Sequence, residues 1–150
     1  MQIIGCFIEK LLNNRLFKCF AKMQELSISS KERNEIIDIT PKIEELIDIE
    51  EGICVVYCPH TTAAVTINEN ADPDVVEDII KETEKIVPFQ DGYLHAEGNS
   101  AAHIKSTLFG PSITIVVSGG RLVLGTWQSI FFCEFDGPRK RRVVVKVVGG

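Results

Sequence analysis

The chain has 150 residues, of which 45% are hydrophobic and 25% charged, proportions typical of one average globular domain. Its net charge of −5 at pH 7 disfavours a general surface for nucleic acid or for an anionic membrane. No stretch reaches the ~18 apolar residues of a membrane span, and the five cysteines lack the spacing of a disulfide framework, so we expect a cytoplasmic protein without nucleic-acid or membrane partners.

The first 22 residues differ in character from the rest of the chain. Apolar side chains recur at helical spacing over residues 3–12. This pattern is typical of an amphipathic interaction helix, of a loosely attached extension, or of residues that precede an effective start at Met23. We favour an extension at residues 1–22 and a single domain at residues 23–150.

The first half of the domain contains alternating signals for strands and helices. Apolar and polar residues alternate around Leu26 and over Glu35–Ile39, which predicts two strands. Thr40–Pro41 predicts a helix with Thr as its N-cap and Pro at its first position, ending by Glu51–Gly52. The apolar run Ile53–Cys58 predicts a central strand.

The second half repeats these signals and then becomes rich in strands. Ala63–Asn68 reads as a strand, and Asp72–Pro73 opens a second helix that stops at Pro88. Asn99 is positioned to cap a third helix that ends at Gly110. Four more strands are predicted in the last forty residues: Ser112–Val117, Arg121–Thr126, Trp127–Phe135 and Arg142–Val148. The order of elements predicts an α+β domain.

All three histidines, His60, His95 and His103, lie in polar segments beside these elements. Neutral imidazole is a good zinc ligand, and an open catalytic zinc site takes three protein ligands plus water. The gaps of 35 and 8 residues match no local zinc motif, so a metal-free pair of acid–base histidines remains an alternative. Taken alone, each histidine is more often structural or simply exposed.

Other polar segments have the chemistry of a binding site. A cluster of oxygen ligands of the kind that Mg²⁺ prefers is offered by Asn68, Glu69, Asp72 and Asp74. The alternative is helix capping, above all for Asp72 and Asp74. Asn99 and Lys105 belong to a helix whose N-terminal N–H groups can bind phosphate, and Arg121, after two glycines, adds a cation or belongs to a plain turn.

Two further segments, Cys58–His60 and the basic run at residues 139–142, could be functional or merely structural. Cys58 and His60 stand two residues apart and allow a cysteine–histidine nucleophile, although no group that would stabilise a thiolate is visible. The basic run at residues 139–142 allows contact with nucleic acid, but we predict a solvated hairpin turn, given the acidic total charge.

Three long motifs in this order resemble the YjbQ family. They are HTTAAVTINENADPD at residues 60–74, HAEGNSAAHIK at residues 95–105 and GRLVLGTWQSIFFCEFDGPRKR at residues 120–141. The resemblance extends over about residues 24–150. It implies two packed, mostly antiparallel β-sheets with about three flanking helices, assembled as a homotrimer whose sites lie close to subunit interfaces.

The resemblance also implies a secondary thiamine-phosphate synthase activity, which joins a pyrimidine diphosphate to a thiazole phosphate with loss of pyrophosphate. The implied cofactor is a divalent metal, zinc or, with a diphosphate substrate, magnesium, and the implied partner is a small phosphorylated metabolite. The alternative is a non-catalytic trimeric module that binds a metal or such a metabolite.

The three histidines are carried over from the matching motif positions as the metal site, and the other site residues are chosen for the chemistry that the implied reaction needs. The expected metal ligands are His60, His95 and His103. The expected catalytic residues are His60, Glu69, His103 and Lys105. The expected substrate-binding residues are Thr61, Asn68, Asn99, Arg121, Trp127 and Asp136. Among these, Lys105 and Arg121 would balance charge on the diphosphate, Glu69 or Asp136 would steady positive charge on the pyrimidine methylene, and Trp127 would stack on a planar ring or anchor a core or an interface.

Overall fold

The computed structural model describes residues 22–150. The predicted extension therefore lies outside the described residues, except for Lys22, which begins the first strand. Three helices follow: α2 (Thr40–Glu44), α3 (Pro73–Ile86) and α4 (Ser100–Phe109). The strands are β1 (Lys22–Ser29), β2 (Glu35–Asp38), β3 (Glu51–Tyr57), β4 (Ala63–Glu69), β5 (Ser112–Ser118), β6 (Arg121–Leu122), β7 (Gln128–Glu134) and β8 (Lys140–Gly149).

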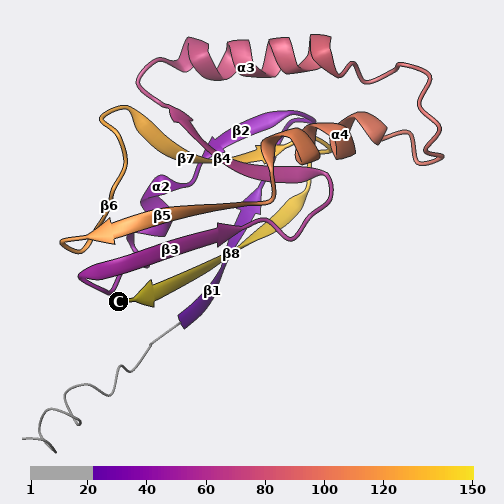
Figure 1. The fold of residues 1–150 in the computed structure, drawn as a ribbon. Coiled ribbons are helices and arrows are strands. Elements are labelled where there is room, and N and C mark those ends of the chain that lie inside the picture. The colour runs from indigo at the N-terminus through magenta and orange to yellow at the C-terminus, as the bar shows by residue number, and fades with distance from the viewer. Residues whose placement is uncertain (1–21) are drawn as a thin grey trace, which may run out of the picture.

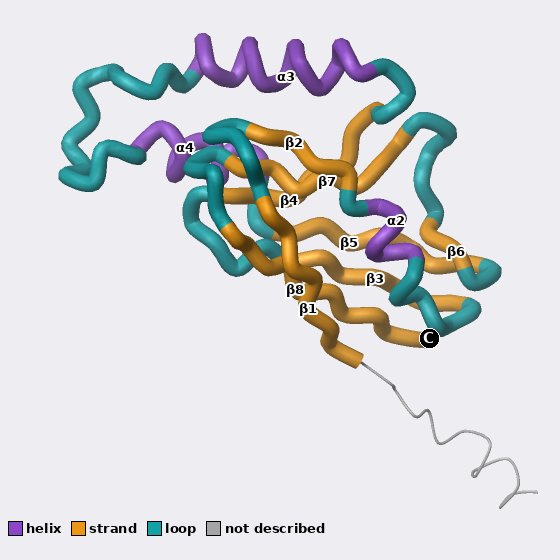
Figure 2. Tube along the Cα trace, turned by 180° about the vertical axis from the view of Figure 1, so that it is seen from behind, coloured by secondary structure: helices purple, strands orange, loops and turns teal. Residues whose placement is uncertain are grey.

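Two antiparallel sheets and a helical layer make up the domain (Figure 1). The larger sheet has the strand order β1-β8-β3-β5-β6 and the smaller one the order β2-β7-β4. Helices α3 and α4 lie on the far side of the smaller sheet, and no helix among the described residues covers the outer face of the larger sheet (Figure 2). The predicted α+β class and the pair of packed antiparallel sheets are confirmed, and β3 is the central strand of its sheet, as its apolar run predicted.

The smaller sheet is buried on both faces, which explains the unbroken apolar run in its middle strand. Val65, Ile130 and Phe132 pack toward the larger sheet, in the main core. Phe131 and Cys133 point the other way, into a second cluster with Ala64, Ala102 and Phe135, beside Val76 and Phe109 of the two helices. A strand covered on both sides carries apolar residues at every position instead of alternating with polar ones.

Helix α3 begins as the sequence predicted. Asp72 is the N-cap and its side chain accepts a hydrogen bond from the Asp74 N–H at 2.9 Å, while Pro73 occupies the first helical position. The helix has no fully buried residue, because only one stripe of half-buried side chains faces the smaller sheet. Among the helices of residues 22–150, none is both long and apolar enough to cross a membrane.

Two predicted details are wrong. The N-cap of α2 is Ile39, and Thr40 is instead the first residue of the helix, where its hydroxyl accepts a hydrogen bond from the Ile130 N–H at 2.7 Å. Tertiary contact with β7 has taken the oxygen that would have capped the helix. The strand predicted at Arg121–Thr126 is only two residues long, because the chain leaves β5 after Leu122 to cross to the other sheet.

Candidate functional site

His60 lies in the short connection that carries the chain from β3 in one sheet to β4 in the other. Its Nε2 accepts a hydrogen bond from the Arg142 backbone N–H at 3.1 Å. Burial and the positive charge of Arg141 lower the pKa of this imidazole below its usual value. A neutral imidazole whose Nε2 accepts a hydrogen bond carries its proton on Nδ1, so His60 presents an N–H donor at Nδ1.

His95 and His103 form a pair at the start of α4. His95 belongs to the long loop between α3 and α4, and His103 to the first turn of α4. Their ring centroids are 5.3 Å apart and the rings meet edge to face. Together with five other residues they line an open cavity of about 630 Å³: Gly92, Tyr93, Leu94, Ser100 and Ile104. The exposed His95 also has Nε2 3.7 Å from a Glu97 carboxylate oxygen.

His103 connects the pair to His60, because it also borders a second cavity of about 550 Å³. That cavity is lined by His60, Thr61, Tyr57, Cys58 and Pro59, and across from them by His103, Ser106, Thr107 and Pro111. The Ser106 hydroxyl donates to the Ala63 carbonyl at 2.7 Å and so holds α4 against the start of β4. The three histidines therefore share one region, with His103 common to both cavities. Within residues 22–150, however, no three His, Cys, Asp or Glu side chains gather closely enough to hold one metal ion.

Asn99 and Asp136 are brought together at the start of α4. The Asn99 amide donates to a carboxylate oxygen of Asp136 at 3.0 Å, and Arg139 forms an ion pair with the same oxygen at 2.8 Å. Asn99 is the N-cap residue of α4, as predicted, but its side chain makes no capping hydrogen bond. Its own amide oxygen is buried and has no hydrogen-bond donor among the described residues.

Lys105 lies apart from the histidines. Its side chain is buried beneath α4 with its Nζ 3.5 Å from the Asn34 amide oxygen. Asn34 in turn donates to Glu84 of α3 at 2.6 Å. The cavity at this point holds about 10 Å³, enough for about one water molecule and too little for a substrate. Lys105 therefore lies between α4 and α3, and its side chain does not reach either histidine cavity.

Asn68, Glu69 and Trp127 lie at the opposite end of β4 from His60. Glu69 pairs with Gln128 and Ala63 with Glu134, so the two ends of β4 are about 20 Å apart at the usual rise per residue. Asn68, Glu69 and Trp127 line a separate cavity with Gln128 and the loop before it. Arg121 is exposed and pairs with Ser118, at the end of β5 that is remote from Pro111 and the histidines. The expected site residues thus fall into a histidine region and at least one distant group.

The sequence interpretation missed an ion pair. Arg141 donates two hydrogen bonds to Glu134, one of them at 2.6 Å, and also bonds the Thr62 hydroxyl. Glu134 is fully buried and the Arg141 side chain is only 8% exposed. The prediction that residues 139–142 form a solvated hairpin turn is therefore wrong: Lys140, Arg141 and Arg142 begin β8, which belongs to the other sheet from β7. The signal was present in the sequence: a glutamate inside an apolar strand requires a charged or polar partner.

The Cys58 thiol is poorly suited to nucleophilic chemistry. It lines the His60 cavity but is almost fully buried, and burial raises its pKa to about 11. Cys54 and Cys133 are buried core residues, as predicted. At neutral pH all three thiols hold their protons.

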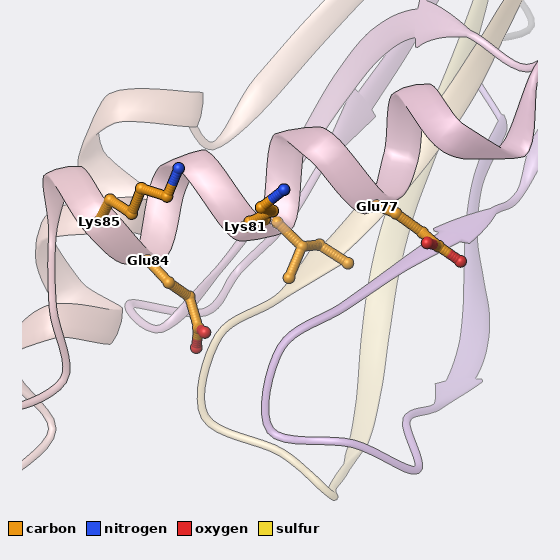
Figure 3. Close-up of a pocket in the computed structure, with 5 residues that line it drawn as sticks. Glu77, Lys81, Glu84 and Lys85 are labelled. Carbon is orange, nitrogen blue, oxygen red and sulfur yellow. The ribbon is translucent and has the colours of Figure 1, made fainter.

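A groove along α3 contains charges but no constellation for catalysis. Its lining alternates acidic and basic residues around Ile80, and Figure 3 shows the charged ends spread along the helix. Such a pattern is typical of a solvated helix face with i,i+4 neighbours of opposite charge. The histidine region is therefore the candidate functional site.

The fold and this site define a class of small α+β proteins with two antiparallel sheets and a histidine region between β3, β4 and α4. The family model described as "UPF0047 protein YjbQ-like" matches residues 24–150. The chain belongs to this family, the YjbQ or UPF0047 family, as the three motifs predicted.

Individual relatives agree over most of their length. The UPF0047 protein YugU of Bacillus subtilis is 47% identical over 131 residues, which is 85% of this chain and 99% of the relative. The UPF0047 protein MJ1081 of Methanocaldococcus jannaschii is 52% identical over 125 residues, or 81% of this chain and 91% of the relative.

Solved structures share the fold. A YjbQ/UPF0047 protein of Clostridium acetobutylicum superimposes with a TM-score of 0.81 at 50% identity, covering 83% of this chain and 98% of that one. A Sulfolobus solfataricus protein described as YbjQ-like and of unknown function gives a TM-score of 0.83 at 32% identity, covering 87% and 98%.

Proposed function

We propose that this chain is an enzyme that binds a phosphorylated small molecule and a divalent metal at the histidine region. The observation that carries the proposal is the position of His103, which borders one cavity with His95 and another with His60. A ligand with two arms, such as a diphosphate attached to an organic group, can reach imidazoles from both cavities. Imidazole changes its charge near neutral pH and suits proton transfer as well as metal binding.

The metal part of the proposal depends on the donor set. His95 and His103 supply two neighbouring imidazoles, and Nε2 of His60 already accepts the Arg142 N–H. A catalytic zinc normally takes three protein ligands, whereas the described residues offer two neighbouring imidazoles. The proposed metal is therefore held by the histidine pair and completes its coordination with phosphate oxygens of the ligand and water. A bound divalent ion would supply positive charge for a diphosphate leaving group.

The residues themselves supply binding and proton donation. The Nδ1–H of His60 can donate to a phosphate oxygen in its cavity, and the Thr61 hydroxyl offers one more donor there. Because the pKa of His60 is lowered, this imidazole is neutral at pH 7 and acts as a hydrogen-bond donor and not as a cation.

The reaction to test first is thiamine-phosphate synthesis, as the family resemblance implies, and it need not be the physiological one. In that reaction a C–N bond forms between the pyrimidine methylene carbon and the thiazole nitrogen, while the C–O bond to the diphosphate breaks and pyrophosphate leaves with the electron pair. We further propose that the active form is a homotrimer, with a solution mass three times the 16.7 kDa of the chain.

The experiment compares the wild-type chain with His60→Ala, His95→Ala and His103→Ala, and with Lys85→Ala on α3 as a matched surface control. Metal content after zinc loading should be one ion per wild-type or control chain and should fall in His95→Ala and His103→Ala. Product formation should fall by at least about 100-fold in His103→Ala. Unchanged turnover in His103→Ala would overturn the catalytic assignment, and a wild-type chain that retains no metal would overturn the metal part.

A second candidate, a non-catalytic module that binds a metal or a phosphorylated metabolite, is favoured by one feature of the cavities. Among the described residues, no carboxylate, ammonium or guanidinium group lines either histidine cavity. Saturable binding of a phosphorylated ligand that disappears in His103→Ala, with no product under any metal, would support the binding module over the enzyme.

A further inference from the structure

The short connection that carries His60 is fixed at both of its ends. On the β3 side, the Cys58 N–H donates to the Pro111 carbonyl at 2.8 Å. On the β4 side, the carbonyl of the buried Thr62 accepts the Phe135 N–H at 3.2 Å. The backbone on either side of His60 is therefore bound to other elements, and the direction of the imidazole depends on the contacts of the ring itself.

Arg141 contacts this connection with a hydrogen bond that its ion pair with Glu134 does not require. Its Nε and Nη2 donate to the two carboxylate oxygens of Glu134, at 2.8 and 2.6 Å, and Nη2 also donates to the Thr62 hydroxyl at 2.9 Å. A bidentate contact with a carboxylate is already a strong and complete pairing for a guanidinium. The further hydrogen bond connects the buried ion pair to a residue two positions after His60.

The backbone that follows Arg141 makes the direct contact with the imidazole. The Arg142 N–H belongs to the peptide group between these two residues, and it donates to His60 Nε2 at 3.1 Å. The Arg141 side chain is buried and bonded to two partners, so the start of β8 is held in place where this N–H meets the ring. The hydrogen bond at one imidazole nitrogen determines which nitrogen carries the proton.

We propose that Arg141 is a positioning residue of the histidine site, which acts through Thr62 and the Arg142 peptide N–H to hold His60 as its Nδ1–H tautomer. Arg141 itself lines neither histidine cavity. A role limited to joining the two sheets would be complete with Glu134, whereas the hydrogen bond to Thr62 acts on the connection that carries His60. The consequence for ligand binding rests on the function proposed above, and the consequence for the tautomer does not.

The tautomer is measured by ¹⁵N NMR of the full chain, labelled at its histidines, without added metal and at about pH 8.5, where imidazole is neutral. His60→Ala identifies the His60 signals by their loss. In the wild type, Nε2 should resonate as an unprotonated acceptor and Nδ1 as a protonated nitrogen. Arg141→Lys keeps a positive charge beside Glu134 but lacks the planar fork that reaches carboxylate and hydroxyl together, so the two His60 signals should move toward each other as the tautomers mix.

Thr62 offers a milder pair of substitutions, which decides the question if Arg141→Lys does not fold. Thr62→Val removes the hydroxyl and keeps the branched shape, and it should mix the tautomers as Arg141→Lys does. Thr62→Ser keeps the hydroxyl and removes the methyl group, and it should retain the wild-type spectrum. Arg142→Lys is the matched arginine control, because that side chain is exposed and pairs with Glu25, while the N–H that meets His60 belongs to the backbone.

The consequence for the site is measured by calorimetry with pyrophosphate, the leaving group of the reaction to be tested. Thr62→Val should weaken pyrophosphate binding about tenfold, the effect of one lost hydrogen bond to a charged group, and Thr62→Ser should weaken it less than about twofold. In a His60→Ala background, Thr62→Val should cause no further loss, because Thr62 acts through the imidazole.

Two outcomes would overturn the proposal. A wild-type ¹⁵N spectrum in both Arg141→Lys and Thr62→Val would show that the tautomer does not depend on Arg141. An equal loss of pyrophosphate affinity from Thr62→Val in the wild type and in His60→Ala would show a structural effect that does not pass through His60. A wild-type chain that binds no pyrophosphate would count against the function proposed for the histidines, and the NMR comparison would still decide the role of Arg141.

Discussion

Glu134 and Arg141 show how strongly a single pair of residues constrains this fold. The carboxylate accepts hydrogen bonds from Arg141, from the Ser30 hydroxyl and from two backbone N–H groups, all without exposure to solvent. This pair connects β7 to β8, and so connects the two sheets beside His60. The contribution of the pair to the free energy of unfolding is measured by removing one partner, because the charge that then stays buried without a partner is strongly destabilising.

Glu134→Gln should lower the free energy of unfolding by about 3 kcal/mol, since Arg141 would keep its charge in a buried place without a carboxylate. Urea denaturation measures the change. Glu25→Gln is the matched control, because the Glu25–Arg142 pair is exposed and should contribute less than about 1 kcal/mol. Equal effects of the two substitutions would contradict a buried role for Glu134.

Lys105 is a buried amine whose pKa is lowered, first by burial, with nearby Glu84 partly opposing the shift. Between the lowered pKa and the usual lysine value, the unfolded chain binds more protons than the folded one, so stability rises with pH through this window. Lys105→Met should therefore leave the free energy of unfolding at pH 7 unchanged or raise it by about 1 kcal/mol.

The stability difference between Lys105→Met and wild type should shrink as the pH approaches 10, because the wild-type amine is deprotonated there and no charge is buried. Denaturation series at several pH values measure it, with Lys85→Met on the exposed face of α3 as the control. A marked loss of stability at pH 7 would instead show that the contact of Lys105 with Asn34 outweighs the cost of burying the charge.

At the scale of elements, the close approach of two neighbouring strands depends on a glycine. Gly52 in β3 has a φ of 150°, and a Cβ there would lie 2.1 Å from the Val148 carbonyl oxygen of β8. Backbone of a neighbouring strand cannot yield as a flexible side chain can. The glycine is thus required by the pairing of β3 with β8 and not by a turn.

Gly52→Ala should destabilise the domain by about 1–3 kcal/mol, because the added methyl group forces β3 and β8 apart at this point. Gly149→Ala, on the paired residue of β8, is the control: its nearest contact would be an ordinary 3.6 Å and the substitution should cost less than about 1 kcal/mol. Thermal unfolding followed by circular dichroism compares the two, and similar melting temperatures would argue against the clash.

The whole molecule consists of one core between the two sheets and a second one under α3 and α4. Both clusters are built from residues 26–147, and the family match begins at residue 24. A chain that begins at Met23 therefore contains every buried contact of the described domain.

The protein that begins at Met23 should fold with a midpoint of urea denaturation within about 0.3 M of the full chain and with an unchanged slope, because the slope follows the surface exposed on unfolding. Ligand and metal binding at the histidines should also be unchanged. A large loss of stability would show that residues 1–22 contribute to the core and would redraw the domain boundary.

Local chemistry in the sequence predicted much of the architecture. The Asp72–Pro73 cap, the apolar run of β3 and the end of α4 at Gly110 all depend on neighbours within a few residues, and all three are confirmed. The family motifs predicted two packed antiparallel sheets. The capping role of Thr40 was predicted wrongly, because its hydroxyl binds a residue ninety positions away in the chain.

The site depends more heavily on tertiary structure. The sequence determined that three histidines, an asparagine-rich turn and a lone tryptophan exist in polar segments of a YjbQ-family domain. The distances between those segments did not follow from the sequence, because polar groups at the two ends of one strand such as β4 can belong to one site or to two. Only the tertiary structure decided that His103 joins His60 and His95, that Lys105 turns away beneath α4, and that Glu69 and Trp127 form a cavity of their own, since packing between sheets and helices sets which segment ends meet.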